Sequence, residues 1–550
     1  MPEYAWITYV NPGIPAVQQL PAELEEFQRL CWERSAIVRW RCAGSADIAA
    51  NLGGNLLLLL VDCSAGGADV KTACRSIRAT CQSPILLTDP GGLRPEVLEE
   101  FKVVAERAAI IQPNELSDPS IILDRLVHLG ITLPEPCVVL DYEHNDPVMT
   151  EIVRWVGRER LENNIQKFFP EASRVRLQPV AGGWSGAKIC RLLVQGQEYF
   201  LKFFEDSDKC KREHEHHHEA VNWLQQARAE VRIRVVPDIG DDPDSQLRAF
   251  PQRKPVAYPV CYVSASSEDR HRETLKALYR IKDEAFVKKA FQRLVEVLQT
   301  GQTAGPTPIA EPPWDFSEGG NGYFLRPKII IKTFETLEDI GDYGPSMCGN
   351  DPQRWTTRRQ IIELLMSHLP TWLTSPLSVQ RGHTHGDPNP RNCLLPLDGP
   401  SDLRLIDCGD YEPSGRLVSD LALIERDIKL VLMATEEEAD KFFDLDTSRL
   451  SVWCKNEENS IGRGIGFKLG DALPRPTGEF PCGTRAYQLI GLVRQRAKTL
   501  CGKSDPKGIH YFAALLYWTL DSLKYEAIRP TKKLLALYSA SEILLKFQHI

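Results

Sequence analysis

The sequence lacks the marks of a membrane-spanning, exported or disulfide-stabilised protein. Its most hydrophobic run, Leu56–Val61, is far shorter than the roughly 20 apolar residues that cross a bilayer. The N-terminus, Met1-Pro2-Glu3, has no basic residues ahead of an apolar stretch, so we expect no signal peptide. The 15 cysteines include no Cys-x-x-Cys pair. We therefore expect reduced thiols and a cytoplasmic protein.

An excess of positive charge is also missing. The 66 basic and 74 acidic side chains give a net charge of −8, which argues against a dedicated nucleic-acid binder. We expect neither nucleic acid nor a membrane as a partner. Internal repeats and low-complexity tracts are absent as well. With 43% hydrophobic and 25% charged residues over 550 positions, the composition is typical of a globular protein with several structural units of roughly 150 residues each.

Short apolar runs alternate with helical patterns between about residues 35 and 130. Such alternation predicts an α/β domain, in which helices cover a parallel sheet, over residues 1–133. The expected strands are Ala36–Trp40, Leu56–Val61, Pro84–Thr88 and Ala108–Ile111, and the expected helices are Val70–Thr80, Arg94–Arg107 and Asp118–Leu129.

This N-terminal pattern resembles a response-regulator receiver domain of the flavodoxin-like type. Asp62 ends a strand where that family has its phosphoacceptor, and Thr88 ends the next strand. However, no acidic pair follows Ala36–Trp40, and Gln112-Pro113 stands where the family has Lys-Pro. We therefore expect a receiver-like domain without phosphoacceptor chemistry, which offers a surface for a protein partner.

The remaining chain changes character twice. An amphipathic helix is expected over Pro147–Phe169, and hairpin strands follow. Helical patterns dominate after about residue 270, apart from a Pro- and Gly-rich loop expected at Gly301–Asn321. This order predicts an α+β smaller lobe over 147–266 and a large helical lobe over 267–550. The hairpin strands are Val175–Val180, Ala187–Val194 and Tyr199–Phe204, and the main helices are Glu273–Thr300 and Thr484–Phe547.

Three polar residues in the second half suggest phosphoryl transfer. Asp387 is followed five positions later by Asn392, a spacing that can place both side chains in one turn. Asp407 follows a strand expected over Asp402–Ile406 and can meet them. One carboxylate that orients a hydroxyl, together with an amide and a second carboxylate that hold magnesium, forms the minimum set for this chemistry.

The spacing is that of the protein-kinase catalytic loop and its metal-binding Asp-x-Gly. His385-Gly386-Asp387 and Asp420-Leu421-Ala422 resemble aminoglycoside and choline kinases more than protein kinases. Within that group the sequence is most similar to bacterial ternary-complex-associated phosphotransferase-like domains, over about residues 150–550. The resemblance implies a bilobal kinase-like fold and the cofactors ATP and Mg²⁺. It also implies that Asp387 acts on the acceptor and that Asn392 and Asp407 bind the metal.

The smaller lobe contains candidate nucleotide-binding residues. Lys202 interrupts an otherwise apolar strand, and burial of an unpaired charge needs a compensating partner. By resemblance to kinases, Lys202 binds phosphates and pairs with a helical glutamate, for which we choose Glu219 with Glu215 as the alternative. A glycine-rich turn between two strands can bring backbone N–H groups to phosphates. Its residues are Gly182, Gly183, Ser185 and Gly186.

Several alternatives stay open at this point. His214 and His218 are spaced to chelate zinc on a helix, or they form a solvated charged face. Asp410, Glu412, Glu425 and Asp427 form an acidic cleft for a cationic acceptor, or they serve solubility. We expect the protein to transfer the γ-phosphoryl group to a hydroxyl of an unknown small molecule or protein. Otherwise, it is a nucleotide-binding pseudokinase or scaffold in bacterial signalling or defence, or a nucleotidyltransferase on the same fold.

Overall fold

A computed structural model describes the helices, strands and adjoining residues discussed below. The described residues are 5–11, 24, 28, 31, 38–44, 56–62, 85–88, 108–112, 115, 118–131, 138–143, 145–180, 188–237, 242–250, 257–263, 272–300, 308–314, 327–339, 359–360, 362–363, 374, 376–435, 437–439, 483–503, 505–525 and 528–547.

The chain forms two compact units, and each unit is built from several separate stretches of the sequence. Unit 1 comprises Met1–Gly182, Gly186–Lys211 and Ile233–Ser264, and unit 2 comprises Gly183–Ser185, Arg212–Arg232 and Ala265–Ile550. Neither unit is therefore a single continuous stretch of the sequence.

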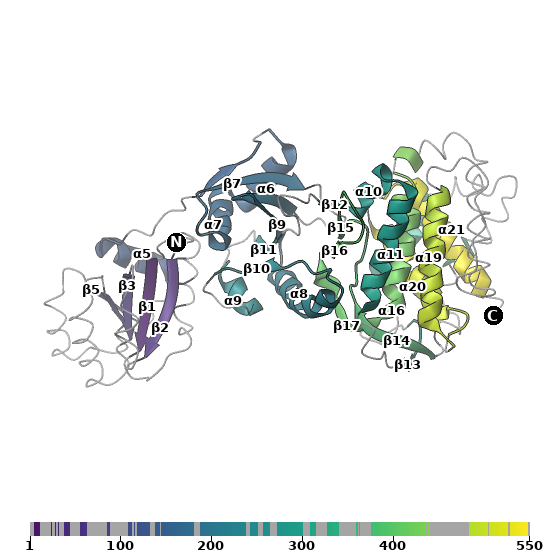
Figure 1. The fold of residues 1–550 in the computed structure, drawn as a ribbon. Helices are drawn as coiled ribbons and strands as arrows, with labels where there is room; N and C mark the ends of the chain where they lie inside the picture. Colours follow the sequence, from purple (N-terminus) through teal and green to yellow (C-terminus); the bar gives the residue numbers. More distant parts are fainter. Residues whose placement is uncertain are drawn as a thin grey trace. The chain divides into compact units, whose positions relative to one another are not determined.

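The N-terminal part of unit 1 is a parallel sheet of five described strands in the order β2-β1-β3-β4-β5 (Figure 1). This is the flavodoxin-like strand order. The side chains of Ile7 and Leu58–Val61 are fully buried, as expected for central strands of a covered parallel sheet. The elements are β1 (Ala5–Asn11), β2 (Val38–Gly44), β3 (Leu56–Asp62), β4 (Ile85–Thr88), β5 (Ala108–Ile111) and the following helix α5 (Pro119–His128).

The prediction that the sheet begins near Ala36–Trp40 was wrong, because β1 precedes it in the chain. The β-branched and aromatic residues of β1 favour a strand, and pairing with both β2 and β3 makes it central. β1 ends at Asn11, whose Nδ2 donates a hydrogen bond to Asp62 Oδ2 at 3.1 Å. The Tyr9 hydroxyl donates to the same oxygen at 2.7 Å. The helices expected at 70–80 and 94–107 lie outside the described residues.

The second part of unit 1 contains a mixed sheet in the order β10-β11-β9-β8-β7-β6. The β7-β8-β9 meander confirms the predicted hairpins. The helix expected over Pro147–Phe169 is two helices, because Gly157 adopts φ 88° between them, a conformation that glycine accepts without strain. The elements are β6 (Val139–Asp141), α6 (Pro147–Val156), α7 (Arg158–Phe168), β7 (Arg174–Val180), β8 (Lys188–Val194), β9 (Gln197–Phe204), β10 (Ile233–Arg234), α9 (Pro243–Arg248) and β11 (Tyr258–Val263).

Unit 2 is mainly helical (Figure 1). The helix α8 (Ser207–Gln226) contributes its residues from Arg212 onward to this unit. The other helices are α10 (Leu275–Ile281), α11 (Glu284–Thr300), α12 (Pro327–Asp339), α16 (Leu417–Asp427), the π-helix η5 (Ile428–Leu432), α19 (Gly483–Cys501), α20 (Ile509–Asp521), the 3₁₀-helix η6 (Ser522–Lys524) and α21 (Pro530–Phe547). None of the described helices combines the length and apolar character needed to cross a membrane.

Two small sheets in unit 2 contain the strands that precede Asp387 and Asp407. One has the order β12-β15-β16, and the other has the order β13-β14-β17. Their strands are β12 (Arg272–Thr274), β13 (Pro308–Glu311), β14 (Leu377–Thr384), β15 (Cys393–Pro396), β16 (Arg404–Leu405) and β17 (Glu412–Arg416), and the 3₁₀-helix η4 (Cys408–Asp410) lies between β16 and β17.

The expectation of a loop over Gly301–Asn321 was wrong where β13 lies. Pro308 begins this strand and Pro312 follows it, which gives the segment the composition of a loop. β13 exists because it pairs in antiparallel fashion with β14, a partner about 70 positions later that local sequence patterns do not reveal.

Candidate active site

The site is built on the turn that leaves β14. Gly386 adopts φ 81°, and a Cβ atom there would lie 1.9 Å from the backbone oxygen of Asp410. Only glycine fits both the left-handed conformation and this close approach. Gly386 therefore lets the chain turn sharply directly before Asp387.

Two amides orient the carboxylate of Asp387. Nδ2 of Asn389 donates to Asp387 Oδ2 at 2.8 Å, and Nδ2 of Asn392 donates to the same oxygen at 3.1 Å and to the Asp387 backbone oxygen at 2.9 Å. Asn389 also accepts from the backbone N–H of Arg391 through Oδ1 at 2.9 Å, as asparagine does in tight turns. The two amides of the turn thus both donate to Oδ2 of Asp387.

Asn392 and Asp407 lie at the same end of the β15–β16 ladder. Cys393 pairs with Leu405, and the next residue, Ile406, donates its backbone N–H to the Asn392 backbone oxygen at 3.0 Å. Asp407 then adopts φ 65° and ψ 60°, a left-handed conformation that costs energy for a residue other than glycine. The two predicted metal ligands therefore lie at the same end of the ladder, and the chain turns sharply at Asp407.

This donor set fits a magnesium ion. The Asn392 amide nitrogen is held by Asp387, so its oxygen is the atom left for a metal. Amide and carboxylate oxygens suit a hard cation such as Mg²⁺. Burial raises the pKa of Asp387 to about 7, the hydrogen bond from Asn389 opposes this, and the charge of Asp407 adds to it. A cation beside Asp407 would offset that repulsion.

The carboxylate of Asp420 accepts hydrogen bonds from the backbone of the turn that precedes Asp387. Its Oδ2 accepts from the backbone N–H of His385 at 2.7 Å, and its Oδ1 accepts from that of Gly386 at 3.0 Å. Burial raises the pKa of Asp420 to about 7, and these two bonds oppose the increase. Burial also lowers the pKa of His385 to about 4, so its imidazole is neutral at pH 7. The Asp420-Leu421-Ala422 motif thus anchors the turn.

Helix α8 contacts the segment that follows Asp407. His216 Nδ1 lies 2.7 Å from the Gly409 backbone oxygen. A Cβ atom on Gly409 would lie 2.4 Å from Oε2 of Glu213, which is buried. The α8 carboxylate that reaches this segment is therefore Glu213.

The sequence left Glu219 and Glu215 as the two choices for the partner of Lys202, and this choice stays a prediction. Glu215 and Glu219 are both exposed. Burial raises the pKa of Tyr411 to about 12, and the negative charge of Glu219 is the second cause of this increase. Sequence analysis missed Glu213, although it lies on the helix face of the buried residues Ala220 and Leu224, which was the available signal.

Three aromatic rings pack α8 against β14. The ring centroids of Trp223 and His383 are 6.0 Å apart, and those of His383 and Tyr411 are 5.9 Å apart, with interplanar angles of 14° and 15°. The Tyr411 hydroxyl lies 2.6 Å from His383 Nδ1. Such rings contribute packing area and a fixed geometry, so His383 positions the start of the turn.

Lys202 belongs to unit 1 and lies on a central strand. β9 pairs with β8 and β11, and Lys202 is the register partner of Ile189 and Val260. Lys202 is buried, and its ammonium lies 4.8 Å from the centre of the Phe204 ring. Lys202 therefore does not lie on an edge strand of this sheet, and its side chain is largely shielded from water. Gly182, Gly183, Ser185 and Gly186 lie outside the described residues.

The histidines of α8 differ in exposure. His214 is buried and His218 is exposed. Burial lowers the pKa of His214 to about 4. Within the described part of the chain, no group of three or more His, Cys, Asp or Glu side chains is arranged to hold a metal ion.

The expectation that four acidic residues line a cleft was wrong for two of them, Glu425 and Asp427. Glu425 is fully buried and forms ion pairs with Arg494 at 2.6 Å and Lys429 at 2.9 Å. Asp427 is buried beside Arg426, with Nε and Oδ1 2.8 Å apart. Cationic side chains neutralise both carboxylates, and of the four acids only Asp410 and Glu412 are exposed.

Comparisons with solved structures return phosphotransferases. One is aminoglycoside phosphotransferase APH(4)-Ia in a ternary complex with AMP-PNP and hygromycin B, with 14% identity over 70% of this chain and 98% of that chain and a TM-score of 0.31. Another is the choline kinase LicA from Streptococcus pneumoniae, with 16% identity over 66% and 99% of the respective chains and a TM-score of 0.28. No curated protein matches the chain.

The assignment rests on the match to a family model. Residues 176–424 match the model of the phosphotransferase enzyme family, and this range contains β9, α8, the Asp387 turn, Asp407 and Asp420. The matched range contains the His385-Gly386-Asp387 and Asp420-Leu421-Ala422 motifs, so the part of the chain that resembles kinases of this type is also the part that is similar to the phosphotransferase enzyme family.

Proposed function

We propose that the protein is an ATP- and Mg²⁺-dependent phosphotransferase that moves the γ-phosphoryl group to a hydroxyl of a small molecule or a protein. The observation that carries this proposal is the Asp387 turn. Its carboxylate is oriented by Asn389 and Asn392, while Asn392 itself is paired across the ladder with the segment that bears Asp407. Phosphoryl transfer needs mainly such positioning and charge stabilisation.

Each residue has a defined task in this proposal. Asp387 accepts a hydrogen bond, and then the proton, from the acceptor hydroxyl through Oδ1. Asn392 and Asp407 would hold Mg²⁺, which when bound would neutralise charge on the phosphate oxygens. Lys202 in unit 1 supplies a buried positive charge for phosphate, and the turn at 182–186 supplies backbone N–H groups. The N-terminal sheet is proposed as a receiver-like domain that binds a protein partner.

The test is transfer of phosphate from γ-labelled ATP. The full chain is incubated with ATP and Mg²⁺, with a panel of aminoglycosides, choline and other amino alcohols, and with cell extract as a source of protein acceptors. We expect a labelled product that disappears when EDTA removes the metal. Thermal stabilisation by ATP and Mg²⁺ without any labelled product would reject the enzyme and favour a nucleotide-binding scaffold.

Glu213 is expected to support the loop that carries Asp407. Glu213→Gln removes a buried negative charge beside Gly409, and loss of a group that supports metal ligands costs about 10- to 100-fold in metal affinity or activity. We expect the Mg²⁺ concentration at half-maximal rate to rise by about that factor. The exposed Asp208 of the same helix provides the control, because Asp208→Asn should leave this concentration unchanged. Equal effects of both substitutions would contradict the assignment.

A further inference from the structure

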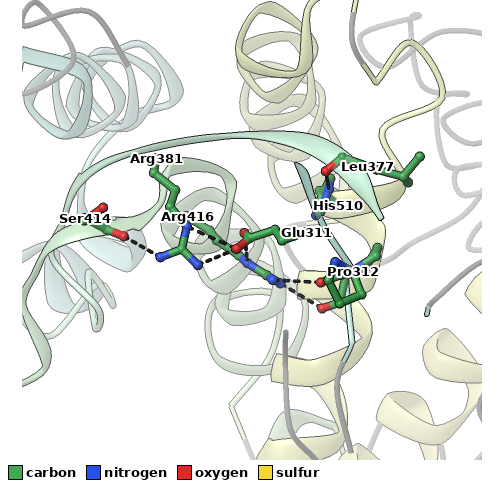
Figure 2. Close-up of polar contacts among 8 residues, drawn as sticks. Glu311, Pro312, Leu377, Arg381, Ser414, Arg416 and His510 are labelled. Atoms are coloured by element: carbon green, nitrogen blue, oxygen red, sulfur yellow. Dashed lines mark hydrogen bonds and ion pairs between the residues drawn. The ribbon is translucent and has the colours of Figure 1, made fainter. Parts of the chain in front are cut away.

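A buried carboxylate far from Asp387 in the sequence joins two strands that flank the site. Glu311 ends β13 and is 2% exposed. Its Oε1 accepts a hydrogen bond from Nε of Arg416 at 2.7 Å. Its Oε2 accepts from Nη2 and Nε of Arg381 at 2.5 and 3.2 Å. Figure 2 shows the carboxylate between the two guanidinium groups.

The two arginines are direct cross-strand partners. β14 and β17 are antiparallel, and Arg381 is the register partner of Arg416. Directly opposite residues project from the same face of a sheet, where like charges destabilise the pair. Their side chains are only 22% and 7% exposed, so water screens the repulsion poorly. The charge of Glu311 offsets it.

Other bonds hold the two guanidinium groups in place. Arg416 donates through Nη1 to the backbone oxygen of Pro313 at 2.8 Å and through Nη2 to that of Pro312 at 2.9 Å. Arg381 donates through Nη1 to the Ser414 backbone oxygen at 2.8 Å. The planar fork of arginine makes such multiple bonds geometrically specific.

The start of β14 is held by a different element. Nε2 of His510, in α20, lies 3.2 Å from the backbone oxygen of Leu377, the register partner of Glu311 (Figure 2). The first residue of β14 is thus held by α20, while Glu311 holds the middle of the strand through Arg381.

These two strands determine where the reacting groups lie. β14 ends at Thr384, and Asp387 follows within three residues. β17 begins at Glu412, which pairs with Thr384 across a register shift, and Asp407 precedes it by five residues. A displacement of β14 along β17 would therefore displace Asp387 relative to Asp407.

We propose that Glu311 is a positioning residue that keeps β14 and β17 in register and thereby sets Asp387 against Asp407. The role rests on the proposed phosphotransferase function, and Glu311 acts through the two arginines without contact to substrate. Misplacement of reacting groups by about 1 Å can cost on the order of 100-fold in rate.

Amide hydrogen exchange tests the proposal without relying on activity. Glu311→Gln keeps the side-chain shape and removes the charge. We expect the peptide that carries the His385 and Gly386 amides to exchange about tenfold faster, because local opening follows lost contacts, while a peptide from α19 stays as in the wild type. Glu335→Gln, which removes an exposed ion pair with Lys332, is the matched control and should change neither peptide.

Steady-state kinetics supply the second measurement. Glu311→Gln is expected to lower kcat by about 10- to 100-fold with little change in KM for ATP, since it disturbs alignment and not binding. Glu311→Asp keeps the charge and should retain more of the wild-type kcat. If Glu311→Gln does not fold, Glu311→Asp carries both measurements against Glu335→Asp.

The outcomes separate this role from the proposed function. Lower stability with unchanged exchange at His385 and Gly386, or with unchanged kcat below the unfolding temperature, would mean that Glu311 is only structural and would overturn the inference. A wild-type protein without phosphate transfer would reject the proposed function, and exchange alone would then decide whether Glu311 orders the turn.

Discussion

Asp387→Asn is expected to lower kcat for phosphate transfer by about 10²- to 10⁴-fold, the usual contribution of general acid–base catalysis. The substitution leaves an oxygen that can accept the hydrogen bonds from Asn389 and Asn392, so the turn keeps its geometry. It replaces the second carboxylate oxygen with an NH₂ group, which cannot take a proton from the acceptor. The loss is therefore chemical and not conformational.

Single-turnover rates measure the loss of chemistry, and ATP binding measures whether the site keeps its conformation. We expect Asp387→Asn to bind ATP and Mg²⁺ within about twofold of the wild type, because an interaction used only in the transition state affects rate and not binding. Asp398→Asn changes an exposed acid in the nearby β15–β16 connection and should retain full activity. A fully active Asp387→Asn protein would exclude Asp387 as the base.

Glu425→Gln should cause the largest loss of stability among single substitutions outside the site. The Glu425 carboxylate accepts from Arg494 through both oxygens, at 2.6 and 2.8 Å, and from the Tyr511 hydroxyl at 2.5 Å. Removing its charge leaves the buried cations Arg494 and Lys429 facing each other. Breaking a buried ion pair in this way costs about 3–5 kcal/mol, measurable by chemical denaturation at pH 7.

The pH dependence of this loss has a defined sign. Burial alone would raise the pKa of Glu425, but the charges of Arg494 and Lys429 outweigh it and lower the pKa to about 2. Because the pKa of Glu425 is lower in the folded state, the stabilisation that its carboxylate contributes is complete at pH values above the unfolded pKa of 4.5. This stabilisation is lost as the pH falls towards 2. The stability difference between wild type and Glu425→Gln should therefore shrink over that window.

A charge-free replacement provides the control for this second prediction. Changing Glu425, Arg494 and Lys429 together to methionine removes the ions without leaving one unpaired. Such replacements are often neutral or stabilising, so we expect the triple variant to be more stable than Glu425→Gln. If Glu425→Gln were as stable as the wild type at pH 7, the ion pairs would contribute nothing.

Spacing along the chain predicts the geometry of the Asp387 turn well, because the contacts of this turn are local. The five-residue interval from Asp387 to Asn392 is closed by hydrogen bonds within one turn, and the strand before Asp407 lies at the expected place. The sequence analysis did not identify Asn389, although an asparagine between two prolines is a typical turn residue. Its role depends on which side its amide faces, and spacing alone does not settle that.

Contacts between distant segments account for most of what the sequence did not reveal. Glu311 and Arg381 are 70 positions apart, and Glu425 and Arg494 are 69 positions apart. A charged residue looks solvated in the sequence until its partner is known. The same holds for β1, whose central place follows from pairing with strands that begin at Val38 and Leu56.

The discontinuous make-up of unit 2 has a consequence for biosynthesis. The residues from Arg212 to Arg232 emerge from the ribosome early, yet they belong to a unit completed by α19, α20 and α21 near the C-terminus. About 160 further residues must therefore be synthesised after Trp223 before His383 is present to pack against it. Domains that depend on such remote contacts fold slowly and expose apolar surface meanwhile. The nascent chain is thus most in need of chaperone protection while the segment after α8 is being made.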